Sequence, residues 1–233
     1  MSEDSAQGDP GRPASQARLP EPFVHLVELE ELAALEREAD RAAAESGLAQ
    51  YGRLLHTWQA ILDRPGLFAA YLPFLRAVAG PGSLPAGLKE LSALLVAHLN
   101  NCRYTVSHRG NASLSAGRTP EQMRQVVSGD WAAFDEATRA ALQATREVTL
   151  LPPQVAYDAE PGVLEPETLA ALRSHFDDEQ IVELVMSISI WNGLARFHRT
   201  MQFTLDMPPA PEGVDLPLPG SSGAVGDQAS EGH

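Results

Sequence analysis

Apolar residues recur with helical spacing along most of the chain. Leucines fall near one stripe within residues 27–47, and an apolar run within residues 84–101 is bounded by Pro85 and by two asparagines. A repeat of three to four residues places apolar side chains on one face of an α-helix. The same spacing predicts helices in five further segments: residues 51–64, 65–80, 132–151, 164–176 and 177–203.

Residues that start and end helices agree with this division. Gly47 is expected to end the first helix, and Pro65 separates the two helices that follow. Thr119 offers an N-cap and Pro120 a first-turn proline for another helix. Because β-branched clusters are short and do not alternate with helices, the pattern argues against a doubly wound α/β fold. The sequence predicts an all-α, single-domain helical bundle.

Both ends of the chain lack this spacing. Residues 1–22 are polar and rich in proline, and residues 208–233 are rich in proline, glycine and serine. Such segments cannot bury enough apolar area to offset the conformational entropy of the chain. We therefore expect two disordered tails, residues 1–22 and 208–233, around one ordered domain of residues 23–207.

The composition narrows the choice of partners. The net charge is −14, and an acidic surface repels nucleic acid and anionic membranes. No run of 18 apolar residues predicts a membrane span, and the polar N-terminus does not resemble a signal peptide. A single cysteine cannot form an intramolecular disulfide. We expect a cytoplasmic protein that acts on a small molecule.

The stretch "NNCRYTVSHRG", residues 100–110, holds the only cysteine, Cys102. If a helix starts there, its dipole would lower the pKa of the thiol and make it reactive; the alternative is an inert buried thiol. His108 could transfer protons near neutral pH, or be a core or surface histidine. A zinc site of His98, Cys102 and His108 is weighed but disfavoured, because the two asparagines interrupt the helical spacing. No cofactor or metal is predicted.

Glu90 shares a helix face with apolar residues, including Leu94 and Ala97. A carboxylate there is costly unless it is paired or neutral. It is therefore interpreted either as a general base with a raised pKa or as a structural glutamate paired with an arginine.

Residues 88–123 resemble the core of the carboxymuconolactone decarboxylase family, which includes the alkylhydroperoxidase D-like proteins. The family pattern places a glutamate before an apolar helix, followed by N-x-C-x-Y-C-x-x-H-H and a glycine. Glu90, Cys102, Tyr104, His108 and Gly117 match these positions. Downstream, an aromatic–Asn…Arg pattern resembles the second helical segment of the family, with three matching residues: Trp191, Asn192 and Arg196.

Two positions depart from the redox members. Thr105 stands where the second cysteine of the pair is expected, and Arg109 stands where a second histidine is usual. Peroxidatic members form a disulfide between two cysteines, so that cycle cannot close within this chain.

Three hypotheses follow from this resemblance. The first is a non-redox acid–base enzyme that decarboxylates, isomerises or cyclises a small organic substrate. Glu90 would move protons with His108, and the other matching residues would form the substrate site: Tyr104, Thr105, Arg109, Trp191, Asn192 and Arg196. The second is a peroxidase that uses Cys102 with an external thiol. The third is a non-catalytic binding or assembly protein. The resemblance also implies a homo-oligomer, a trimer or a multiple of one.

Overall fold

The structure, a computed structural model, describes residues 22, 24–150 and 163–216 of the chain. These described residues are helical and contain no strand, which confirms the predicted all-α class. The elements in chain order are η1 (Leu29–Ala34), α1 (Glu38–Tyr51), α2 (His56–Leu62), α3 (Leu67–Ala79), α4 (Ala86–Leu99), α5 (Arg103–Ser115), α6 (Pro120–Ser128), α7 (Glu136–Thr149), α8 (Pro166–His175) and α9 (Asp178–Thr200).

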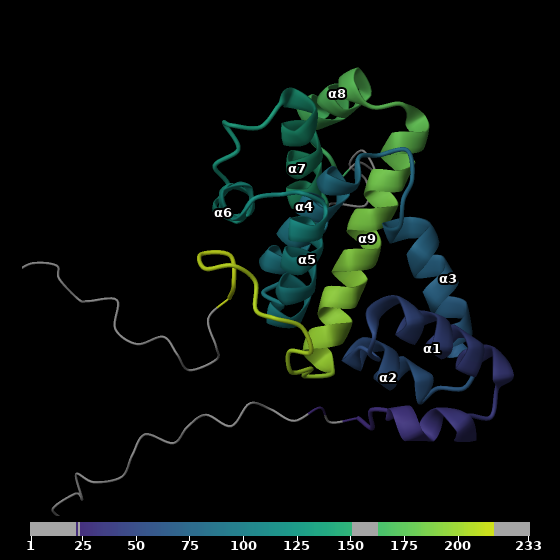
Figure 1. Cartoon of the computed structure of the whole chain (residues 1–233). Helices are drawn as coiled ribbons and strands as arrows, with labels where there is room; N and C mark the ends of the chain where they lie inside the picture. Colours follow the sequence, from purple (N-terminus) through teal and green to yellow (C-terminus); the bar gives the residue numbers. More distant parts are fainter. Residues whose placement is uncertain (1–21, 23, 151–162, 217–233) are drawn as a thin grey trace, which may run out of the picture.

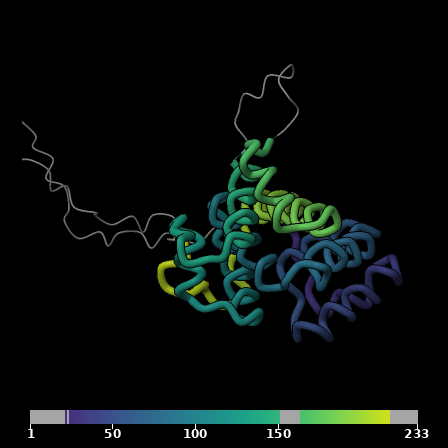
Figure 2. The backbone as a smooth tube through the Cα atoms, turned by 90° about the horizontal axis from the view of Figure 1, so that it is seen from above, coloured from purple at the N-terminus to yellow at the C-terminus, as the bar shows by residue number. Residues whose placement is uncertain are grey.

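Helices α4 and α9 organise the packing. α4 contacts α5, α6, α7 and α9, and α9 in turn contacts α3, α5, α7 and α8. Figure 1 shows α9 running between α3 and α5. Figure 2 shows the N-terminal helices on one side of the molecule and α4 to α7 on the other. Since α4 is apolar around most of its circumference, it supplies residues to two hydrophobic clusters, such as Leu88 to one and Leu91 to the other.

The first predicted helix differs from the structure in its bounds. The segment divides into η1 and α1, and α1 continues past Gly47 to Tyr51. Gly47 packs beneath Trp58, where an added Cβ would lie 2.6 Å from Cζ3 of the indole. The residue that follows the helix is Gly52, with φ of 70°, a left-handed conformation that glycine adopts readily. The prediction of a stop at Gly47 was wrong because that glycine serves close packing.

The connection between α4 and α5 follows the sequence prediction. Asn100 ends α4, Asn101 has a φ of 51°, and Cys102 is the N-cap of α5. Asparagine tolerates the left-handed region better than most residues, so the chain can turn here and start a new helix at once. Thr119 caps α6 as predicted, through a hydrogen bond that its hydroxyl accepts from the backbone of Gln122.

The chain after α9 folds back over α5. Ser107 donates a hydrogen bond to the carbonyl of Pro208, and Ala210 packs so closely on Gly110 that an added Cβ would lie 2.9 Å away. Val214 is fully buried, in the same cluster as α4. The packed part therefore extends at least to residue 216, and the domain boundary expected at residue 207 is too early.

In the part of the chain that the structure describes, no helix combines the length and apolar character that crossing a membrane requires.

Candidate active site

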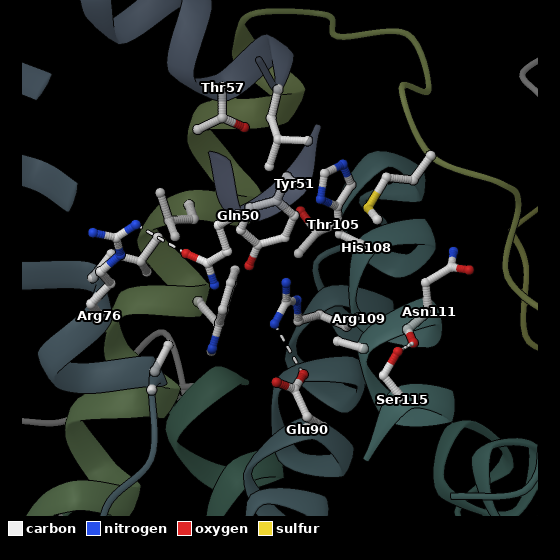
Figure 3. A pocket seen from close by; sticks show the side chains of 18 of the residues that line it. Gln50, Tyr51, Thr57, Arg76, Glu90, Thr105, His108, Arg109, Asn111 and Ser115 are labelled. Atoms are coloured by element: carbon white, nitrogen blue, oxygen red, sulfur yellow. Dashed lines mark hydrogen bonds and ion pairs between the residues drawn. The ribbon is translucent and has the colours of Figure 1, made fainter. Parts of the chain in front are cut away.

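A cavity of about 700 Å³ lies between the N-terminal helices and the α4–α5–α9 group. This is a usual volume for a small-molecule site. Figure 3 shows polar side chains from several helices directed toward one another around it. Five residues singled out in the sequence line the cavity: Glu90, Thr105, His108, Arg109 and Trp191.

His108 and Asp206 form a close pair at one wall. Nε2 of His108 lies 2.6 Å from Oδ1 of Asp206, and both side chains are at least nine-tenths buried. The other carboxylate oxygen accepts hydrogen bonds from the hydroxyl of Tyr104 and the backbone N–H of His56, each at 2.7 Å. Asp206 is thus held from three sides by groups that lie far from it in the sequence.

The charges of this pair follow from its surroundings. Burial alone would raise the pKa of Asp206, but hydrogen bonds from His108 and Tyr104 lower it to about 2. Burial lowers the pKa of His108, and Asp206 offsets only part of that effect. Near pH 7, His108 is therefore a neutral imidazole beside a carboxylate. Because Asp206 accepts from Nε2–H, Nδ1 of His108 carries the free lone pair.

A chain of hydrogen bonds leads from Asp206 to a second histidine. The carboxylate can only accept, so the hydroxyl of Tyr104 donates to it. Tyr104 then accepts from Oγ1 of Thr57 at 3.3 Å. Thr57 in turn accepts from Nε2 of His198 at 2.9 Å. Burial lowers the pKa of His198 to about 3, so this ring is neutral and its Nδ1 is an acceptor.

The same chain ends at the cysteine. Oγ1 of Thr105 lies 2.8 Å from Nδ1 of His198 and donates its proton there. Sγ of Cys102 lies 3.0 Å from Oγ1 of Thr105, so the thiol donates to the hydroxyl. Each group in this series of hydrogen bonds therefore donates to the next one on the way to Asp206. Cys102 is the first donor, as a protonated thiol.

Cys102 itself does not line the cavity. The residue is 1% exposed, and burial raises the pKa of its thiol despite its hydrogen bonds with Thr105 and the backbone. Of the two interpretations of Cys102 drawn from the sequence, these surroundings support the inert buried thiol. The N-terminus of α5 is where it was predicted, but its dipole is worth at most about 2 kcal/mol and burial outweighs it.

An ion pair lies beside His108 in the cavity lining. Oε2 of Glu90 accepts a hydrogen bond from Nη1 of Arg109 at 3.0 Å, and the guanidinium carbon lies 4.0 Å from the centre of the Trp191 ring. The arginine-paired interpretation of Glu90 is thus the one that the contacts support. Glu90 nevertheless lines the cavity, and its side chain is 18% exposed.

Besides Cys102, three residues predicted to bind substrate lie outside the cavity lining. Tyr104 stands behind the cavity wall, where it donates to Asp206. Asn192 accepts a hydrogen bond from Asn100 and donates to Thr149, within the helix packing. Arg196 lies on the exposed side of α9. The structure does not bring Asn192 and Arg196 to the cavity, and their substrate-binding role stays a prediction.

Sequence reasoning missed three residues of the network: Asp206, His198 and Thr57. Asp206 follows α9 in a segment with no recognisable motif, and it lies 98 positions from its partner His108. His198 belongs to an apolar helix, where a histidine is ordinarily a core residue. Only the spatial meeting of α2, α5, α9 and the C-terminal segment reveals them. Within the described ranges, no group of three or more histidine, cysteine or acidic side chains is arranged to hold a metal ion.

The helical bundle, with a cysteine and a histidine in the first two turns of one helix, defines the class of the protein. Residues 65–147 match the model of the carboxymuconolactone decarboxylase family. The match lies in the segment that carries the sequence resemblance, and it supports a protein of the carboxymuconolactone decarboxylase and alkylhydroperoxidase D-like type. Two positions in this segment depart from the redox pattern: Thr105 stands in place of the second cysteine and Arg109 in place of the second histidine.

Solved structures share the fold. The debrominase Bmp8 is 19% identical, with a TM-score of 0.63 over 80% of this chain and 93% of that protein. A cysteine-to-alanine variant of Bmp8 in complex with 2,3,4-tribromopyrrole is similar at 16% identity, a TM-score of 0.63 and coverage of 82% and 93%. An uncharacterised peroxidase-related protein from Ralstonia eutropha JMP134 is 21% identical, with a TM-score of 0.60 over 87% and 96%. No curated protein matches the chain.

Proposed function

We propose that this protein is a non-redox acid–base enzyme that decarboxylates, isomerises or cyclises a small organic substrate in the cavity. The observation that carries the proposal is the neutral His108, held by Asp206 at a cavity wall, while the only thiol is protonated and lies outside the lining. An imidazole oriented by a carboxylate is a common general base.

The proposed roles differ from those drawn from the sequence. Nδ1 of His108 takes a proton from the substrate, and Asp206 stabilises the imidazolium that forms. In an isomerisation the imidazolium returns the proton to another atom of the same molecule. In a decarboxylation the C–C bond to the carboxylate breaks, CO2 leaves with no change in the redox state of the protein, and His108, protonated from solvent, gives a proton to the carbon left behind. Glu90 holds Arg109 in the cavity lining and does not itself move the proton, because its charge is already paired.

The names of the similar proteins refer to several different reactions and do not select one of them. The family is named for a decarboxylase, and two solved structures of the same fold are named as a debrominase and a peroxidase-related protein. A peroxidase that uses Cys102 with an external thiol is the main alternative. Its weakness is that a thiol must be ionised and reachable to attack a peroxide, and the pKa of Cys102 is raised by burial.

A panel of three substrates separates these functions. A carboxylated γ-lactone tests decarboxylation, an organic hydroperoxide with dithiothreitol tests peroxidase activity, and 2,3,4-tribromopyrrole with a thiol tests debromination. We expect turnover of the lactone-type substrate, a loss of at least about 100-fold in His108→Gln, and a change within about threefold in Cys102→Ser.

The opposite result is equally clear. Peroxide consumption or debromination that disappears in Cys102→Ser and survives in His108→Gln would assign the chemistry to the thiol. Binding of panel members by the folded wild-type protein without any turnover would favour the non-catalytic alternative.

We further propose a homo-oligomer, a trimer or a multiple of one, on the resemblance to the family, and a cytoplasmic location on the composition of the sequence. Analytical ultracentrifugation of the full chain tests the assembly, and a monomer at all concentrations would contradict it.

A further inference from the structure

The guanidinium of Arg109 is only partly used by the protein. Its Nη1 donates to Glu90, and its Nε is buried without a hydrogen-bond partner. Nη2 donates none of the hydrogen bonds found among the described residues. An arginine offers five N–H donors, and a buried one left unpaired costs free energy comparable to a lost hydrogen bond. The edge formed by Nε and Nη2 therefore has donors available for a ligand.

Two neighbours fix where this edge lies. The ion pair with Glu90 holds one end of the guanidinium, and the indole of Trp191 covers one of its faces at 4.0 Å. Figure 3 shows the side chain reaching into the middle of the cavity from α5. A donor edge held in this manner suits a planar acceptor with two oxygens, because the two hydrogen bonds can form in parallel.

The charges around the cavity allow no more than one negative group on the ligand. The lining contains two arginines, Arg76 and Arg109, and one carboxylate, Glu90, while His108 and His198 are neutral near pH 7. The ionised Asp206 behind His108 brings the total to zero, and Arg76 is exposed, so Arg109 is the cation best placed to bind a carboxylate beside His108. A second carboxylate near Arg109 would be repelled by Glu90 and Asp206.

The rest of the wall suits a flat apolar body. Four aromatic residues line the cavity: Tyr51, Trp58, Tyr71 and Trp191. Leu55, Leu72, Leu75 and Leu194 add aliphatic surface. Aromatic faces and aliphatic side chains favour a planar conjugated or aromatic group over a sugar or a flexible polar chain.

We propose that the cavity binds a monocarboxylate with a flat, unsaturated body, whose carboxylate lies on the Nε–Nη2 edge of Arg109 beside His108. This inference rests on the proposed function in using the same cavity, and it names the class of substrate. The carboxylate anchors the molecule, and its body extends toward the aromatic walls.

Calorimetric titration of the full-length protein tests this with two matched probes. Benzoate and benzamide have nearly the same shape and differ in charge. We expect benzoate to bind the wild type at least about tenfold more tightly than benzamide. Phthalate, which adds an adjacent second carboxylate, should bind more weakly than benzoate.

Variants of Arg109 test whether this residue binds the carboxylate. Arg109→Gln should remove the preference for benzoate, and Arg109→Lys, which keeps the charge but not the planar fork, should retain only part of it. Arg124→Gln removes a cation on the surface of α6 and should change nothing. Thermal melting confirms that each variant is folded before titration.

The outcomes separate this inference from the proposed function. His108→Gln should keep the preference for benzoate even though it loses turnover. Equal binding of benzoate and benzamide, or a preference that Arg109→Lys and Arg109→Gln both leave intact, would overturn the inference and leave acid–base catalysis on a neutral substrate standing. A larger loss in Arg76→Gln than in Arg109→Gln would also overturn it.

Discussion

The first and second turns of α5 present two potentially reactive groups in opposite surroundings. Cys102, at the first turn, is sealed from the cavity, and its thiol donates a hydrogen bond to Thr105. His108, at the second turn, lines the cavity and is oriented by a carboxylate. Cysteine is by type the stronger nucleophile, but burial keeps its proton in place. Access and partners, more than residue type, decide which group can react.

The two groups are nevertheless connected. The hydrogen bonds that run from Cys102 through Thr105 and His198 end at the carboxylate that orients His108. The second turn therefore supplies the proposed base, and the first turn helps to fix the side chains behind it.

The largest expected effect comes from removing the carboxylate that orients His108. In Asp206→Asn the new amide can donate to Nε2 of His108, which moves the ring proton to Nδ1 and removes the lone pair from the cavity. We expect kcat for the substrate that the panel identifies to fall about 10²- to 10⁴-fold.

A pH–rate profile and a matched variant check the cause. Without Asp206, the pKa of His108 should fall further, so the acid limb of the residual activity should move to lower pH. Asp215→Asn removes another carboxylate of the C-terminal segment, one that pairs with Arg103 instead, and should keep kcat within about threefold. An Asp206→Asn enzyme with wild-type kcat would show that the pair does not act in catalysis.

Acid should destabilise the buried network through His198. Its pKa is about 3 in the folded protein and 6.5 as the ordinary value, so between these pH values the unfolded chain binds more protons. The free energy of unfolding should therefore decrease as the pH falls from about 6.5 toward 3, by on the order of a few kcal/mol.

Urea unfolding at pH 7, 5 and 4 measures this dependence. His198→Gln should flatten it, whereas His25→Gln, at an exposed histidine, should not. The change in the free energy of unfolding with pH is compared, and not its absolute value, because His198→Gln also removes hydrogen bonds. An unchanged slope in His198→Gln would place the acid sensitivity elsewhere.

Introducing a second cysteine beside Cys102 should give the protein thiol-dependent peroxidase activity. Thr105→Cys puts a thiol where the hydroxyl now lies 3.0 Å from Sγ of Cys102, and the new residue lines the cavity. We expect hydroperoxide consumption with dithiothreitol to rise at least about tenfold, with an intramolecular disulfide seen by mass spectrometry. Ser113→Cys, a buried position on the same helix, should give no gain. Equal activity in the wild type would make Cys102 sufficient by itself.

The smallest effect is expected at the ion pair of Glu90 and Arg109. Glu90→Gln removes the partner of Arg109 but leaves His108 and Asp206 intact, so kcat should fall only about three- to tenfold. A loss as large as that of His108→Gln would return the role of general base to Glu90.

Much of the fold could be predicted because its signals are local. The Asn100–Asn101 turn, the cap at Thr119 and the apolar spacing of α4 each depend on residues close in sequence. Gly47 misled because a glycine that ends a helix and one that packs beneath an indole look the same in a sequence. The candidate site was predicted in part: His108 and Arg109 face the cavity, but the acid beside His108 could not be identified.

The sequence by itself determined that the protein is helical, where most helices begin, and that one thiol lacks its partner, because propensity, capping and composition act over a few residues. Only the tertiary structure decided that Asp206 orients His108, that Glu90 is paired with Arg109 and that Cys102 is sealed away. Burial and hydrogen bonding depend on which distant segments meet, and a pKa responds to those neighbours more strongly than to the adjoining sequence.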